Sequence, residues 1–170
     1  MENRRKFSEL YLRNFTFGVE DSMVSTVGLL TGVATAGVPR ATILLTGVVL
    51  IFVEAFSMAA GSFLSEDSVE EYISRKTVSA RGPLAAGAVM FFSYLLSGFI
   101  ILFPYLVFPV NKAIMVSIAL SLTLLYVLGA WVAKISGVAM GRRGMRSLFI
   151  GGSAVAIGML AAQIGVWLTY

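Results

Sequence analysis

Two carboxylates and a thioether inside apolar stretches have the greatest potential for chemistry in this sequence. Glu54 is the sole ionisable side chain between Ala41 and Leu64. Placing a lone carboxylate at that depth in a bilayer costs roughly 2 to 3 kcal/mol, which argues for a functional role. Met58 lies four residues later and so shares a helix face with Glu54. The pair could hold a divalent cation; alternatively, Met58 fills space and a neighbouring hydroxyl satisfies Glu54.

A second intramembrane acid, Asp21, lies in the preceding apolar segment with Glu20 beside it. Asp21 is about seven residues from the N-terminal end of its expected helix, and Met58 is about seven from the C-terminal end of the next, so both lie roughly 10 Å deep. An antiparallel hairpin would bring Asp21, Glu54 and Met58 level, with Glu20 above them. Oxygen ligands suit Mg²⁺ or Ca²⁺, whereas a thioether shifts the preference toward softer ions such as Fe²⁺.

A further group of acids follows the second apolar segment. Helical spacing pairs Glu66 with Glu70 and Asp67 with Glu71. These four residues could form a cation-collecting face at the membrane surface. The alternative is a solvated helix face, which is the commoner role of a charge run.

Composition excludes several classes of protein. The 170 residues are 58% hydrophobic, which is too apolar for a soluble domain and indicates an integral membrane protein. Cysteine and histidine are absent, so disulfides, thiolate chemistry and imidazole ligation are excluded. An enzyme is disfavoured because no nucleophile and base pair is evident. The net charge of +4 does not indicate nucleic acid, because the basic residues flank apolar segments.

The expected fold is an all-α membrane protein with five transmembrane helices. Residues 1–13 read as an amphipathic cytoplasmic lead, and 66–82 as a short acidic and basic cytoplasmic helix. Pro104 and Pro109 are expected to end the third membrane helix, and 134–146 to form a loop. Together, residues 14–170 form one transmembrane domain, whose expected spans are approximately 14–36, 41–65, 83–103, 113–132 and 147–168.

The distribution of basic residues predicts the topology. With a cytoplasmic N-terminus, eleven of the thirteen Lys and Arg residues are cytoplasmic, and only Arg40 and Lys112 lie outside. Five spans then place the C-terminus outside, with Trp167 and Tyr170 as an interfacial aromatic belt.

Small residues mark a helix-packing interface on the first span. Gly28 and Gly32 form a G-x-x-x-G motif and continue the polar stripe of Asp21 and Ser25. An odd number of helices leaves this face without an obvious partner inside the chain. We therefore expect a homodimer joined through the first span.

Two motifs carry a resemblance to a known family. Phe17–Thr26 (FGVEDSMVST) and Glu54–Ser65 (EAFSMAAGSFLS) resemble the first- and second-helix signatures of the vacuolar iron transporter family. The usual Asn-Asp-Gly is Glu20-Asp21-Ser22 here, and Ser62 replaces an acid expected after Gly61. The chain resembles a short form that lacks the cytoplasmic metal-binding insertion before the third helix.

The resemblance implies five membrane helices, a homodimer, and movement of Fe²⁺, often also Mn²⁺, out of the cytoplasm in exchange for protons. It places Asp21, Glu54 and Met58 on the ion pathway. Fe²⁺ or Mn²⁺ would be the substrate, and no cofactor would stay bound. The membrane would be the plasma membrane in a prokaryote, or a vacuolar or other organellar membrane in a eukaryote. The alternative is a membrane-embedded structural or assembly protein that kept the fold without transport.

Overall fold

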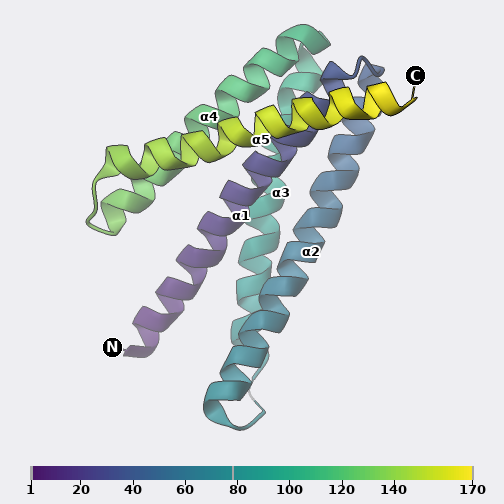
Figure 1. Cartoon of the computed structure of the whole chain (residues 1–170). Helices are drawn as coiled ribbons and strands as arrows, with labels where there is room; N and C mark the ends of the chain where they lie inside the picture. Colours follow the sequence, from purple (N-terminus) through teal and green to yellow (C-terminus); the bar gives the residue numbers. More distant parts are fainter. Residues whose placement is uncertain (1, 78, 170) are drawn as a thin grey trace.

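The computed structural model describes residues 2–77 and 79–169, without the side chains of residues 2–7 and 169. The side chains of the expected lead, Arg4, Arg5, Lys6 and Phe7, and the belt residue Tyr170 therefore lie outside the described part. The described residues form an all-helical fold (Figure 1). Its five helices are α1 (Glu2–Thr35), α2 (Arg40–Ser74), α3 (Arg81–Val107), α4 (Val110–Ile135) and α5 (Met140–Thr169).

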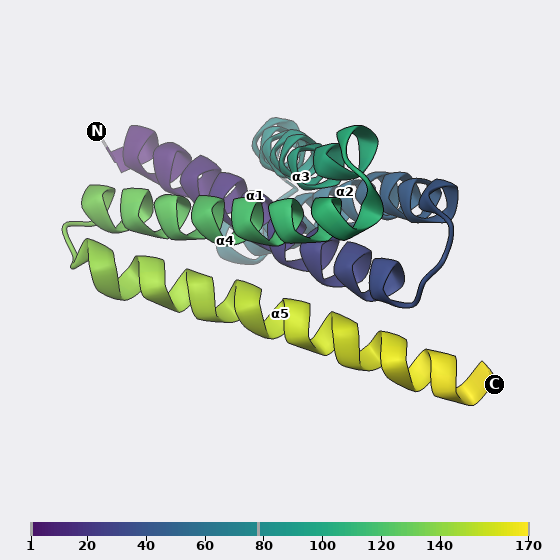
Figure 2. The same ribbon diagram turned by 90° about the horizontal axis from the view of Figure 1, so that it is seen from above.

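Helix α1 is the centre of the bundle and contacts each of the other four helices. The α2–α3 hairpin packs on one side of α1, and the α4–α5 hairpin crosses it on the other (Figure 1). Viewed from above, α5 lies at the edge of the molecule and its C-terminal half extends away from the bundle (Figure 2). We call the end with the N-terminus and the α2–α3 and α4–α5 connections the basic end, and the other the opposite end.

Apolar packing and hydrogen bonds from buried hydroxyl groups hold the bundle together. One core cluster joins Leu30, Ile43 and Ile51 to α3 and α4 near the opposite end, and a second surrounds Met23 and Leu125 nearer the middle. Buried serines bond to the backbone of neighbouring helices, as the Ser117 hydroxyl does to the Ile101 carbonyl at 3.1 Å. Small hydroxyl residues suit membrane bundles because they allow close helix packing and satisfy their own polar groups.

In the part of the chain that the structure describes, four helices, α2 to α5, are long and apolar enough to cross a membrane. Their large apolar side chains are widely exposed, such as Phe56 at 70% and Phe149 at 68%, as lipid-facing residues are. The expected first span falls in α1, which does not meet the same criterion, because Glu20, Asp21 and several Ser, Thr and Gly residues make it less apolar. Neighbouring helices surround α1, so it needs less lipid-compatible surface than the outer helices.

The helices are longer than the expected spans. The lead and the first span lie in one continuous helix, α1. Helix α2 continues past the second span through most of the acidic stretch to Ser74, where Arg75 adopts a left-handed conformation (φ 55°). Pro104 does not end α3, because a proline in the last turn removes only one late hydrogen bond and the helix continues to Val107.

The arginine-rich stretch expected as a loop is helical, since α5 begins at Met140 and not near residue 147. Close packing against α4 explains why Gly144 belongs to this helix. A Cβ atom at Gly144 would lie 2.8 Å from the Tyr126 ring, and one at Gly129 would lie 2.8 Å from the Ser147 hydroxyl. Because Gly129 and Gly144 carry no side chain, α4 and α5 can approach each other closely here.

The small-residue face of α1 has a partner within the chain, contrary to expectation. A Cβ atom at Gly32 would lie 2.5 Å from the Gly158 carbonyl oxygen, and one at Gly28 would lie 3.0 Å from the Ala154 carbonyl oxygen. Helix α5 therefore covers this face. Gly28 and Gly32 serve helix packing, but between α1 and α5 of one chain.

Candidate functional site

The structure places Asp21 of α1 within electrostatic reach of Glu54 of α2. Both side chains are half-buried, and they are close enough for their charges to repel each other. Each carboxylate lies within a long helix, so the backbone holds both in place. Two carboxylates that repel each other favour binding of a positive charge between them.

Helix α3 fixes the rotation of α1 beside this pair. The Ser22 hydroxyl donates a 2.7 Å hydrogen bond to the Tyr94 backbone carbonyl, and the Ser25 and Tyr94 hydroxyls share another of 2.7 Å. The Tyr94 side chain is fully buried and lies within electrostatic reach of both Asp21 and Glu54. These bonds from α3 hold α1 with Asp21 directed toward α2.

Met58 lies beside a cavity of about 660 Å³ between α1, α2 and α3. Ser57 and Ser62 also line it, and the Ser62 hydroxyl donates to Oδ1 of Asn14 at 2.5 Å. Arg13 and Glu66 form an ion pair and line the same cavity on the side nearer the basic end of the molecule. Met58 therefore lies one helical turn from Glu54, between the acidic pair and the basic end.

Glu20 is not brought to this pair. It lines a different cavity between α1 and α5, where its Oε1 accepts a hydrogen bond of 3.2 Å from the Ser147 hydroxyl. The neighbouring acids Glu20 and Asp21 thus contact different helices.

The acids expected to form a cation-collecting face are spread along the end of α2. Glu66 is half-buried and pairs with Arg13, whereas Glu71 is exposed. Throughout the described residues, no three acidic side chains converge in a way that could hold a metal ion. Neither this face nor the Asp21 and Glu54 pair therefore provides three converging acids among the described residues.

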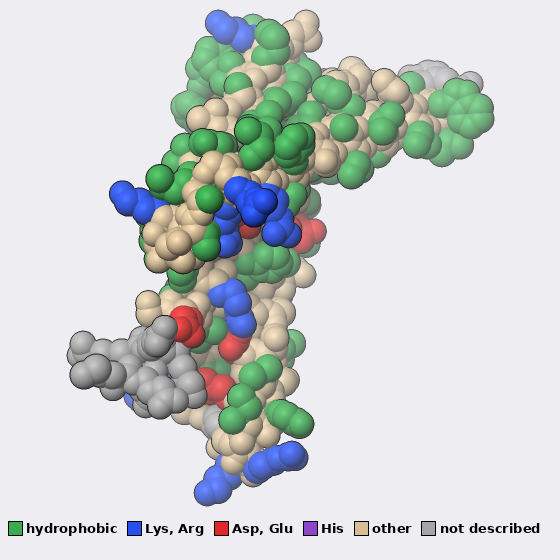
Figure 3. Space-filling view, turned by 60° about the vertical axis from the view of Figure 1, so that its left-hand side comes forward, with side chains coloured by type: hydrophobic (Ala, Val, Ile, Leu, Met, Phe, Trp, Pro, Cys, Tyr) green, Lys and Arg blue, Asp and Glu red, His purple; other side chains and the backbone are tan. Residues whose placement is uncertain are grey.

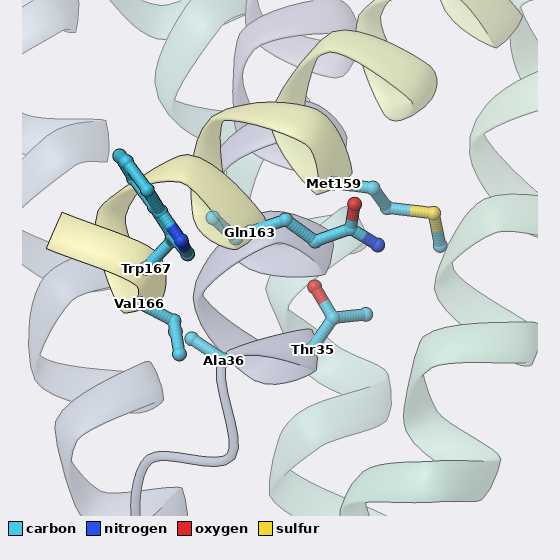
Figure 4. A pocket seen from close by; sticks show the side chains of 7 residues that line it. Thr35, Ala36, Met159, Gln163, Val166 and Trp167 are labelled. Carbon is cyan, nitrogen blue, oxygen red and sulfur yellow. The ribbon is translucent and has the colours of Figure 1, made fainter. Parts of the chain in front are cut away.

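Another cavity, of about 690 Å³, lies at the opposite end between α1 and α5. Thr35 and Gln163 supply its polar side chains, and Trp167 and Met159 line it as well (Figure 4). The Thr35 hydroxyl donates to the Gly32 carbonyl at 2.8 Å. None of the expected site residues lines this cavity.

Sequence reasoning did not connect Tyr94 or Asn14 with the site. Tyr94 lies on α3 together with Ser93 and Ser97, and all three side chains are buried. Its position beside Asp21 depends on how α3 is rotated against α1, which local spacing does not define. Asn14 lies where the lead was expected to meet the membrane, and it is 2% exposed.

Comparison with known proteins identifies the family. The VIT family model matches residues 12–81 and 70–163, and the two matches overlap at the turn between α2 and α3. A search of curated proteins found no match. The matched segments contain Asp21, Glu54 and Met58 and the helices that hold them. Because the family model covers most of the chain, this multi-pass membrane protein belongs to the VIT family of membrane metal-ion transporters.

Proposed function

We propose that this chain exports Fe²⁺, and also Mn²⁺, from the cytoplasm in exchange for protons. The observation that carries the proposal is the pair of half-buried carboxylates, Asp21 and Glu54, inside a bundle whose family transports metal ions across membranes. The basic end would face the cytoplasm, in keeping with the positive-inside rule.

The chemistry follows from charge balance. Two ionised carboxylates carry a charge of −2, which one divalent ion or two protons would neutralise. A carboxylate must lose its proton to act as a ligand, so metal and protons compete for Asp21 and Glu54. This competition would couple the movement of one ion to the return of about two protons.

Met58 would supply selectivity. Its sulfur lies one turn from Glu54, beside the cavity that extends toward the basic end. A thioether binds the softer first-row ions better than Mg²⁺ or Ca²⁺. Metal would approach through this cavity, passing the Arg13–Glu66 ion pair at its mouth.

Transport by purified protein in liposomes tests the proposal. With an acidic interior, we expect Fe²⁺ and Mn²⁺ to accumulate inside, with proton release detected by an external pH dye. Collapsing the gradient with an ionophore should abolish accumulation. Uptake that is indifferent to the gradient would contradict proton coupling, and equal uptake of Mg²⁺ would contradict the proposed selectivity.

Two observations favour a second candidate function, a membrane-embedded structural or assembly role. No group of three acids converges among the described residues, and the connection between α2 and α3 is short. A protein that kept the fold without transport would need no such group. Saturable Fe²⁺ or Mn²⁺ binding by the purified chain in detergent would exclude this alternative, and its absence would favour it.

A further inference from the structure

A cavity of about 560 Å³ lies at the turn between α4 and α5, and we call it the arginine cavity. Arg142, Arg143 and Arg146 line it from the first two turns of α5, with Glu20 and Ser147 beside them. Figure 3 shows basic side chains gathered at this turn with acidic ones next to them. Asp21, Glu54 and Met58 do not line the cavity, so it is separate from the proposed ion pathway.

The arginine cavity has an excess of positive charge. Within the described residues, none of its three guanidinium groups forms an ion pair with a carboxylate. The Glu20 carboxylate instead accepts the hydrogen bond from Ser147. Three positive charges and one negative charge leave +2 (3 − 1 = 2). Guanidinium groups bind phosphate oxygens in a planar, two-pronged geometry, so this excess fits a phosphate group.

The surroundings of the cavity are apolar and exposed, as expected at a membrane surface. Val138 and Ile150 line the cavity, and they are 53% and 51% exposed. Phe149 is next to Ile150 and is 68% exposed. On the same hairpin, Trp131 of α4 makes an edge contact with Phe15 of α1 at 6.1 Å. Trp side chains favour the membrane interface, which places the arginines at headgroup level.

We propose that the arginine cavity binds the phosphate headgroup of an anionic phospholipid, with the lipid chains lying along the exposed apolar side chains of α5. A phospholipid fits better than a soluble phosphate because the same site offers guanidinium groups and an apolar wall. Lipid binding here would brace the α4–α5 turn against α1.

Native mass spectrometry of the purified chain in a neutral detergent tests this site. We expect one phosphatidylglycerol per chain to bind more tightly than phosphatidylcholine with the same acyl chains. Changing Arg142, Arg143 and Arg146 to Gln together should weaken phosphatidylglycerol binding on the order of a hundredfold, because each basic residue contributes to attraction of an anionic lipid. The matched control changes Arg75, Lys76 and Arg81 to Gln, which removes the same charge from the α2–α3 connection and should leave this binding unchanged.

Glu20→Gln provides a second test, which does not require the chain to fold with all three arginines replaced. It removes the one negative charge of the cavity and keeps an oxygen for Ser147, so phosphatidylglycerol binding should tighten about fivefold. Inorganic phosphate at millimolar concentration should not displace the lipid. Displacement by phosphate would assign the site to a soluble anion. Equal loss in both triple variants, or equal binding of the two lipids, would overturn the proposal.

Discussion

Glu20 and Asp21 are neighbours in sequence but face different parts of the bundle. Asp21 lies near Glu54, whereas Glu20 bonds to Ser147 of α5. Successive residues of a helix are rotated by about 100°, so two adjacent acids cannot serve one site equally. This separation makes Asp21 the more informative residue for a charge-removing substitution.

We predict that Asp21→Asn abolishes transport and leaves the fold intact. The substitution keeps the shape of the side chain and removes the charge that a divalent ion or a proton requires. Transport of Fe²⁺ into liposomes measures the loss, and the elution profile in detergent measures folding. Glu9→Gln is a suitable control because it removes one carboxylate from an exposed position on the same helix. Parental transport rates in Asp21→Asn would exclude this residue from the pathway.

Met58→Leu tests the role of the sulfur atom. The change keeps volume and apolarity and should cost less than about 1.5 kcal/mol in packing. We expect Fe²⁺ transport to fall more than Mn²⁺ transport, because Mn²⁺ gains less from a thioether. Rates for the two ions in parallel liposome assays provide the measurement.

Met115→Leu is the matched control for this substitution. Met115 lies on α4 and is 66% exposed, so its sulfur has no place in the proposed pathway. Its variant should transport both ions like the parent. If Met58→Leu lowered both rates equally, or neither, Met58 would only fill space.

At the scale of helices, the close contact between α1 and α5 depends on glycines, which have no side chain. A Cβ atom at Gly32 would meet a backbone carbonyl of α5, which cannot move aside as a flexible side chain could. Membrane helices gain little from hydrophobic association in lipid, so close backbone approach matters more to them than to soluble helices.

We predict that Gly32→Ala destabilises the bundle. Overpacking should cost about 1–3 kcal/mol, and the higher helix propensity of alanine should offset roughly 1 kcal/mol of that cost. The melting temperature in detergent should fall. Gly152→Ala is the control, because an added Cβ at Gly152 meets nothing within 4 Å. It should leave the melting temperature unchanged or raise it. Equal effects of the two variants would mean that the α1–α5 contact does not limit stability.

At the scale of the whole molecule, α5 is the least buried of the four helices that are long and apolar enough to cross a membrane: 11% of its apolar 18-residue stretch is buried, against 22% or more in the others. A groove of about 490 Å³ runs between α1 and α5, and small residues such as Ala161, Ala162 and Gly165 line it. Small residues permit close approach of another helix. Gly28 and Gly32 form part of the α1 side of this groove, where α5 already packs closely against them. If the chain forms the expected homodimer, the α5 side of the groove is therefore the better interface.

Crosslinking tests that interface, because the chain has no native cysteine. Ile164→Cys, on the exposed half of α5, should give disulfide-linked dimers in membranes. Leu45 lies on α2 near the same opposite end and is 66% exposed. The Leu45→Cys variant should remain monomeric on denaturing gels. Dimers from Leu45→Cys alone would move the interface to α2.

The sequence alone determined the class of protein and most of the helices, because hydropathy and helix signals are local properties. Runs of apolar residues predicted five spans, and four of them lie in helices long and apolar enough to cross a membrane. Asp21 and Glu54 stood out because charges in apolar helices are costly. Helix ends were less predictable. The start of α5 depended on packing of Gly144 against α4, and local glycine content indicated a loop instead.

Only the tertiary structure decided which residues face one another. The rotation and crossing of each helix result from contacts between residues far apart in sequence, such as the 2.7 Å bonds that Ser22 and Ser25 form with Tyr94. Those contacts direct Asp21 to Glu54 and leave Glu20 facing α5. They also give Gly28 and Gly32 a partner in the same chain. Spacing along one helix defines a face, but long-range packing determines what that face meets.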